Sequence, residues 1–231
     1  MKVVVFIFIF VISTTFGNQE QFERGKKVYK MTCVSCHGQN GETNPQMSLV
    51  VKPRKLSKSI LDEEQSYQVV KEGAHYWGAH ADMMPTFKYV LSEQEMRDVT
   101  HYIVNAFNSH RDTDVAKLMA ESEDLTPKQV AKMDKVGKKI FHRNCSMCHG
   151  DTGDGKSEYV EQSKIEENFM YPYNIQKSIL NQDQIFLFIK YGGMHWGSMD
   201  TSMPAWKRKY DDVQLKSVAK YVFENIRKEH K

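Results

Sequence analysis

The sequence contains few cysteines, little net charge and little that could cross a membrane. Its four cysteines all fall in two short motifs, so none is left for a disulfide between distant parts of the chain. The formal net charge is only +3 over 231 residues, which does not indicate a nucleic-acid-binding protein. Beyond Gly17 no segment is long and apolar enough to span a bilayer, and no strand-like alternation stands out. These absences favour a soluble, all-α protein.

The first residues have the three zones of a secretory signal peptide. Lys2 precedes the apolar run from Val3 to Ile12, and small or polar residues then lead to Gly17. An uncleaved membrane anchor is the alternative, but a span needs about 20 apolar residues, and polar residues begin at Asn18. We predict a signal peptide at residues 1–17, a periplasmic location in a bacterium, and no stable membrane insertion after signal removal.

One sequence unit is written twice in this chain. Residues 25–38 align with residues 137–150 at an offset of 112, and from residue 53 onward the offset is 119. Seven extra residues have therefore entered the second copy after its Cys-His motif. Aligned pairs at the second offset include Pro53 with Pro172, Gly73 with Gly192, Trp77 with Trp196, Met84 with Met203, and Tyr102 with Tyr221. This duplication predicts two domains, residues 18–108 and 126–231.

Helix signals recur at matching places in the two copies. Thr126 followed by proline is a good N-cap for the opening helix of the second copy. Ser92 with Glu95 forms a capping-box pattern at the start of the first copy's closing helix, and Asp211 with Gln214 repeats it. Residues 109–125 are polar and predict a linker with a short helix around residues 115–120.

All four cysteines belong to two Cys-x-x-Cys-His motifs, the attachment pattern of c-type haem. Cysteines about one helical turn apart can form thioether bonds along one edge of a porphyrin, and the next histidine can reach the iron. Covalent attachment also stabilises a domain of about 100 residues, which buries apolar surface inefficiently. The motifs are Cys33-Val-Ser-Cys36-His37 and Cys145-Ser-Met-Cys148-His149. We expect two covalently bound haem c groups, each wrapped by one helical domain.

Cysteine pairs of this kind have three other uses in proteins. A thioredoxin-like pair needs a βαβ context, which the sequence lacks. A zinc site of four cysteines would have to join motifs 112 residues apart. Disulfides suit an exported protein, but they leave both motif histidines unexplained.

Methionine is the expected second ligand of each iron, because Met/His ligation is common in cytochromes c. Met84 and Met203 occupy the same aligned position and each precedes a proline, which stiffens the loop. The predicted iron ligands are therefore His37 with Met84 and His149 with Met203. Both methionines could instead fill the core.

Histidines remain rival ligands at one site, since three lie in the segments before these methionines. His75, His80 and His195 have no histidine at their aligned positions. Bis-histidine ligation of a single haem stays open.

Two further pairs could support the haems. Pro53 and Pro172 could each offer a backbone carbonyl to the motif histidine, or be ordinary turn prolines. Trp77 and Trp196 could pack on the porphyrin or donate to a propionate, or be core aromatics.

With these motifs in place, nearly the whole mature chain resembles two class I cytochrome c domains in tandem, as in bacterial di-haem cytochromes c. The resemblance implies opening and closing helices packed together and haems with one exposed edge. It also implies single-electron transfer from a membrane quinol-oxidising complex to a terminal oxidase or reductase.

An electron carrier without catalytic residues is the leading hypothesis. One alternative is a di-haem oxidoreductase of the peroxide reductase or thiosulfate dehydrogenase type, which needs a vacant or unusual distal position. Another is a cytochrome subunit held within a larger respiratory complex.

Overall fold

The computed structural model describes residues 17–46, 53–79, 84–107, 111–122, 124–163, 172–198 and 203–228. Within these ranges the chain is helical and has no strand, which confirms the all-α prediction. The α-helices are α2 (Val34–His37), α3 (Glu63–Glu72), α4 (Glu93–Phe107), α5 (Arg111–Ala120), α6 (Pro127–Val130), α7 (Met133–Ile140), α8 (Ser146–His149), α9 (Glu158–Ser163), α10 (Gln182–Tyr191) and α11 (Asp212–Tyr221). A further α-helical stretch covers residues 17–28 and opens the first domain.

Shorter helical turns complete both domains. The π-helical segments are Tyr29–Cys33, Phe141–Cys145 and Val222–Ile226, and the 3₁₀ turns are Leu56–Lys58, Ile175–Lys177, Gly193–Trp196 and Trp206–Arg208. The segment predicted as a signal peptide lies outside the described residues except for Gly17. None of the helices that the structure describes combines the length and apolar character that a membrane span requires.

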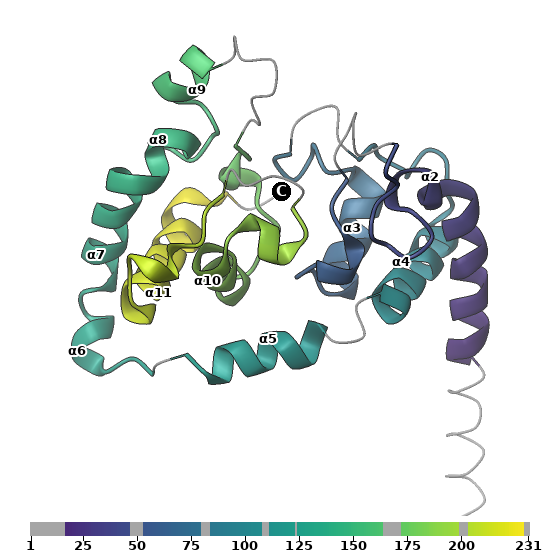
Figure 1. The fold of residues 1–231 in the computed structure, drawn as a ribbon, viewed down its shortest axis with the longest axis horizontal. Coiled ribbons are helices and arrows are strands. Elements are labelled where there is room, and N and C mark those ends of the chain that lie inside the picture. Colours follow the sequence, from purple (N-terminus) through teal and green to yellow (C-terminus); the bar gives the residue numbers. More distant parts are fainter. Residues whose placement is uncertain are drawn as a thin grey trace, which may run out of the picture.

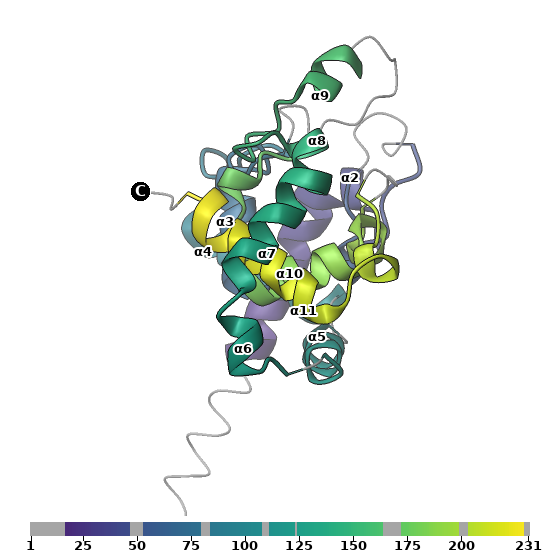
Figure 2. The same ribbon diagram turned by 90° about the vertical axis from the view of Figure 1, so that its left-hand side faces the viewer.

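Two helical domains lie side by side, with α5 running beneath the second of them (Figure 1). In the second domain α7 and α11 pack against each other, and α10 packs against α11 (Figure 2). Helix α5 lies within the segment predicted as a linker, and its Val115, Leu118 and Met119 pack against the core of the second domain.

Opening and closing helices cross at a glycine in each domain. A Cβ atom at Gly25 would overlap the backbone carbonyl of Asp98, and one at Gly137 would overlap that of Ser217. Only glycine allows backbones to approach this closely. The aligned glycines therefore fix the same helix crossing in both domains.

The two crossings differ in their side chains. In the first domain Arg24 donates from Nε to Asp98 at 2.7 Å and from Nη2 at 3.2 Å. The Asp98 side chain is only 3% exposed, whereas the Arg24 side chain is 43% exposed, so the ion pair joins a buried carboxylate to a partly solvated guanidinium. The aligned residues in the second domain are Val136 and Ser217, which carry no charge.

The predicted capping boxes are present. Glu95 N–H donates to Ser92 Oγ at 3.3 Å, and Ser92 N–H donates to the Glu95 carboxylate at 2.8 Å. Asp211 and Gln214 make the same reciprocal pair at the start of α11. Thr126 caps α6 as expected, but a turn after Val130 separates α6 from α7, so the opening helix of the second domain is broken.

We expect Gly137→Ala to destabilise the second domain by about 1–3 kcal/mol, because the added methyl group forces α7 away from α11. Chemical denaturation of the haem-loaded protein measures this loss. The exposed Lys27→Ala, on the opening helix of the first domain, should change stability by less than about 0.5 kcal/mol. Equal stability of Gly137→Ala and the parent protein would show that the crossing tolerates a side chain.

Candidate haem-binding sites

Each Cys-x-x-Cys-His motif begins at the end of a π-helical segment and continues into a short α-helix. Cys33 and Cys145 are the last residues of Tyr29–Cys33 and Phe141–Cys145, and the motifs' remaining residues form α2 and α8. Short π-helical segments are frequent at functional sites because they widen a helix locally. The same distortion in both domains shows that the two motifs are presented in the same way.

The cysteine environment does not suit a redox-active dithiol. Burial, with a smaller contribution from the neighbouring motif cysteine, raises the pKa of the Cys33 and Cys145 thiols to about 12. A thioredoxin-like pair needs the opposite shift, since its reactive thiol is a thiolate near neutral pH. All four cysteines are free of disulfides. They are therefore suited to bonds that keep sulfur uncharged, such as thioethers.

Both motif histidines are held by a backbone carbonyl. His37 Nδ1 lies 3.2 Å from the Arg54 carbonyl oxygen, and His149 Nδ1 lies 3.1 Å from that of Tyr173. Since a carbonyl only accepts, Nδ1 must carry the proton, and Nε2 keeps a lone pair for iron. Burial lowers the pKa of both rings, which favours the neutral form that binds metal.

The suggestion that Pro53 and Pro172 supply these carbonyls was wrong by one residue. In each domain the acceptor belongs to the residue that follows the proline. Proline fixes its own φ and restricts the residue before it, so the loop shape is set while the next carbonyl makes the contact.

Met84 and Met203 occupy equivalent loops. Ala74 N–H donates to the Met84 carbonyl at 2.9 Å, and Gly193 N–H donates to the Met203 carbonyl at 3.0 Å. Met84 packs against the same apolar cluster as Cys33, and Met203 packs against the same cluster as Cys145. Each methionine is thus tied by its backbone to the domain whose motif it would complete.

Among the rival histidines, the two that the structure describes are exposed and directed to other partners. His75 Nδ1 lies 3.0 Å from the Ala79 carbonyl oxygen, and His195 stacks on Tyr191 with ring centroids 4.9 Å apart. His80 lies outside the described residues. Met194, close to His195 in sequence, is 56% exposed. These positions favour Met84 and Met203 as the distal residues.

Of the two tryptophans singled out by the duplication, Trp196 is buried in the core of the second domain and Trp77 is half-buried. The Trp77 indole N–H donates to the Gln68 carbonyl at 3.2 Å, and that of Trp196 donates to the Leu187 carbonyl at 3.1 Å. Their donors are therefore already used within helices α3 and α10. The propionate role considered for them is not supported.

A different tryptophan, Trp206, has the unused donor. Its indole nitrogen is buried, and among the described residues it finds no hydrogen-bond acceptor. A buried donor of this kind costs about 1–3 kcal/mol unless something accepts from it. Trp206 follows Met203 by three residues and aligns with Phe87, which has no such donor. Because the aligned residue is not a tryptophan, the duplication does not single out Trp206 as a site residue.

These observations meet the requirements of a covalently bound haem in both domains. The motif supplies two uncharged sulfurs and an imidazole of fixed tautomer, the methionine loop supplies a thioether, and Trp206 supplies an orphaned donor for a carboxylate. When bound, haem supplies an iron that cycles between ferric and ferrous states. His37 and His149, held by their loop carbonyls, would bind this iron through Nε2.

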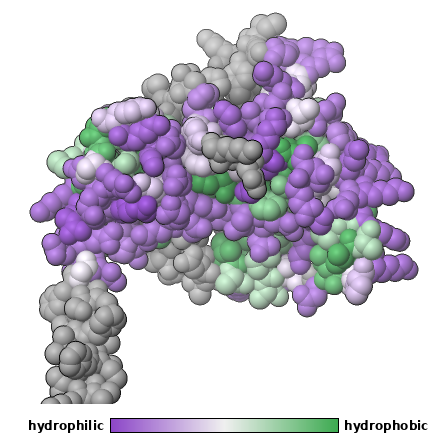
Figure 3. Space-filling model, turned by 180° about the vertical axis from the view of Figure 1, so that it is seen from behind, coloured by the Kyte–Doolittle hydropathy of each residue, from purple (hydrophilic) through white to green (hydrophobic). Residues whose placement is uncertain are grey.

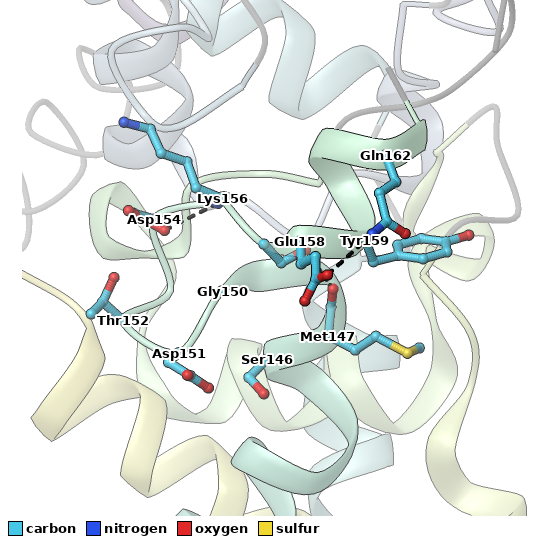
Figure 4. Close-up of a pocket in the computed structure, with 11 residues that line it drawn as sticks. Ser146, Met147, Gly150, Asp151, Thr152, Asp154, Lys156, Glu158, Tyr159 and Gln162 are labelled. Atoms are coloured by element: carbon cyan, nitrogen blue, oxygen red, sulfur yellow. Dashed lines mark hydrogen bonds between the residues drawn. The ribbon is translucent and has the colours of Figure 1, made fainter. Parts of the chain in front are cut away.

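The insertion in the second copy shapes a separate hollow. Helix α9 lies in the segment that carries this insertion. Together with the loop after α8, it forms an open pocket of about 720 Å³. Figure 4 shows Asp151, Asp154 and Glu158 around this pocket, with the Met147 side chain at one side. The pocket lies against the second haem motif, whose Ser146 and Met147 help to line it, and it has an acidic rim.

Family comparisons agree with this geometry. A family model described as "Cytochrome c" matches residues 22–107, and one described as "Cytochrome C oxidase, cbb3-type, subunit III" matches residues 131–222. The chain is therefore built from two cytochrome c domains in tandem, which carry covalently attached haem c.

Curated relatives include subunits of cbb3-type oxidases. The chain is 26% identical over 205 residues to "Cbb3-type cytochrome c oxidase subunit FixP" of Bradyrhizobium diazoefficiens, covering 86% of this chain and 59% of that protein. It is 28% identical over 137 residues to subunit FixPc of Rhizobium leguminosarum bv. viciae, covering 58% of this chain and 41% of the relative. The chain thus spans about two fifths to three fifths of these relatives.

Two other comparisons are more distant. A "Cytochrome c6-like" protein of Nostoc sp. is 28% identical over 107 residues, which cover 45% of this chain and 89% of that protein. The solved Kuenenia stuttgartiensis reducing HAO-like protein complex Kustc0457/Kustc0458 has a chain that matches 89% of this one, with 20% identity and a TM-score of 0.44.

We expect Met84→Ala and Met203→Ala each to remove about half of the near-infrared charge-transfer band of sulfur-ligated ferric haem. Each substitution removes one of the two thioethers expected to bind iron, so the double variant should lose the band. Absorption spectra of the oxidised protein measure this. Met194→Ala is the control and should leave the band intact. An unchanged band in either ligand variant would mean that another residue binds that iron.

We expect Trp206→Phe to lower the reduction potential of the second domain's haem only, because a propionate that loses its donor carries more negative charge and favours ferric iron. A mediated redox titration measures both haems. Trp196→Phe is the matched control and should leave the potentials unchanged, since its donor binds a helix carbonyl. If Trp206→Phe leaves both potentials in place, its indole N–H serves another acceptor.

Proposed function

We propose that this chain is an electron carrier that passes single electrons between partners of a respiratory chain. The observation that supports it most directly is the repetition of one ligand arrangement in both domains. In each, a histidine is fixed by a loop carbonyl and a methionine loop is tied to the same domain. An iron with two protein ligands has no open position for substrate.

The enzyme alternative requires the two sites to differ at the distal position. In a di-haem oxidoreductase one iron must be vacant, labile or unusually ligated. Here both copies carry Met followed by Pro at the same place, and no fifth cysteine is present to act as a thiolate ligand. The two sites therefore favour electron transfer over peroxide or thiosulfate chemistry.

Partners are proposed from the relatives and from the surface. The FixP relatives are oxidase subunits by name, so we propose a terminal oxidase or reductase as acceptor, with a quinol-oxidising complex as donor. Residence as a subunit within such a complex is the second form of the same function. The predicted signal peptide supports a periplasmic location.

The surface is compatible with transient docking. Most of the face in Figure 3 is hydrophilic, and hydrophobic residues gather in small areas. Met147 is 60% exposed and lies within the second attachment motif, and Met31 is 76% exposed and lies two residues before the first. Weak redox encounters use small interfaces of this kind, with an apolar centre and a polar rim.

The test is a comparison of carrier and enzyme assays on the exported, haem-loaded protein. We expect two electrons per chain to be taken up from a reduced donor and passed to an oxidised c-type cytochrome or oxidase. Steady-state turnover with hydrogen peroxide or with thiosulfate should stay at the level of free haem. Substantial turnover with either would overturn the carrier proposal.

A further inference from the structure

The two domains meet through a nearly two-fold set of contacts between aligned residues. Gln65 Nε2 and Gln184 Nε2 each lie 2.7 Å from the other's Oε1, and these two glutamines are equivalent in the duplication. Gln65 also donates to the Ile179 carbonyl at 3.0 Å, and Gln184 donates to the Ile60 carbonyl at 2.9 Å. Ile60 itself is buried in the core cluster of the second domain. The interface is therefore specific and partly buried.

A second reciprocal pair joins the loops that orient the histidines. Lys55 N–H donates to the Gly197 carbonyl at 3.0 Å, and Asn174 N–H donates to the Gly78 carbonyl at 2.9 Å. Lys55 directly follows Arg54, and Asn174 directly follows Tyr173. These are the residues whose carbonyls hold His37 and His149. In each domain, the residue after the one that binds the histidine therefore makes a backbone hydrogen bond to the opposite domain.

The glycines are required for this close approach. Gly78 has φ +92° and Gly197 has φ +84°, a region that other residues rarely adopt. A Cβ at Gly197 would lie 2.6 Å from the Lys55 carbonyl oxygen, and one at Gly78 would overlap the Asn174 carbonyl oxygen. Both glycines are buried.

Side chains reinforce the junction. The Arg54 guanidinium lies over the Tyr173 ring at 5.2 Å from its centroid, and over the Phe188 ring at 5.4 Å. Arg54 and Tyr173 are aligned residues, and each supplies the carbonyl that holds its domain's histidine. The side chains of these two residues therefore pack on each other across the junction. Among the described residues Arg54 makes no ion pair, which leaves its charge at the junction.

We propose that the domain interface sets the hydrogen bond, and with it the reduction potential, of each haem's proximal histidine from the opposite domain. The bond from Nδ1–H to a carbonyl makes the imidazole a stronger donor and so favours ferric iron. If the opposite domain releases the loop, the bond weakens and the potential rises. This inference rests on the proposed ligands His37 and His149, and it does not depend on the identity of the redox partners.

The test uses the crosswise prediction. Replacing Met203 lowers the potential of the second haem, so in Met203→Ala the higher redox wave belongs to the first haem. There, added Gly197→Ala should raise that wave, although Gly197 is in the second domain. In the Met84→Ala background, Gly78→Ala should raise the wave of the second haem. Shifts confined to the haem of the substituted domain would overturn the proposal.

A direct measurement separates this inference from the ligand assignment. In ¹⁵N-histidine-labelled protein, the Nδ1 proton of His149 should exchange with solvent several-fold faster in Gly78→Ala, and that of His37 should do so in Gly197→Ala. If the methionine variants fail to separate the two waves, the distal ligands are misassigned, and this exchange experiment still decides the coupling. Unchanged exchange in both glycine variants contradicts it.

Two milder variants guard against misfolding of the glycine substitutions. Arg54→Lys keeps the charge but loses the flat guanidinium that packs on Tyr173, so the second haem's potential should rise. Gln65→Ala with Gln184→Ala is the matched control, because it weakens the interface away from the histidine loops. An equal rise in this control would show that loose docking, rather than the loop contact, changes the potentials.

Discussion

The hydrogen bond from each motif histidine to a loop carbonyl connects the chemistry of the site to the rest of the fold. It leaves Nε2 of each ring as the nitrogen that would bind iron, and it requires the loop after the aligned proline to stay in one conformation. That loop is placed by a 3₁₀ turn in each domain, Leu56–Lys58 and Ile175–Lys177. The residue that precedes each turn, Lys55 or Asn174, makes a backbone hydrogen bond to the opposite domain. The axial ligand therefore depends on backbone contacts that reach across the molecule.

Duplication explains why so many contacts come in pairs, and divergence explains how the domains became unlike. The glycine helix crossing, the capped closing helices and the paired glutamines are shared. Arg24 with Asp98 supports the crossing in the first domain only, and Trp206 offers an orphaned donor in the second only. If the proposed ligands are the same in both domains, these unequal surroundings should give the two haems unequal potentials, since donors and charges near a haem tune it.

Much of this architecture could be predicted from the sequence, because it depends on local patterns. The attachment motifs, the capping boxes at Ser92 and Asp211 and the helical class all follow from residue spacing. The carbonyl that accepts from each histidine lies one residue after the predicted proline. A proline shows where a loop is stiff, but it does not show which carbonyl oxygen faces the histidine. Trp206 was missed because its unused donor exists only once the chain has folded.

The contacts between the domains could not be predicted from the sequence either, because they too exist only in the folded chain. Gly78 and Gly197 occupy aligned positions in the two copies, but nothing in the sequence tells which backbone they approach. Both glycines are buried at positive φ, and each lies against the backbone of the other domain. The packing of a single domain therefore does not explain why glycine is needed there. A junction of backbone hydrogen bonds transmits a displacement better than a junction of exposed side chains, since it has few alternative rotamers to absorb it. The two haem sites are therefore better understood as one coupled unit than as two independent carriers on a common chain.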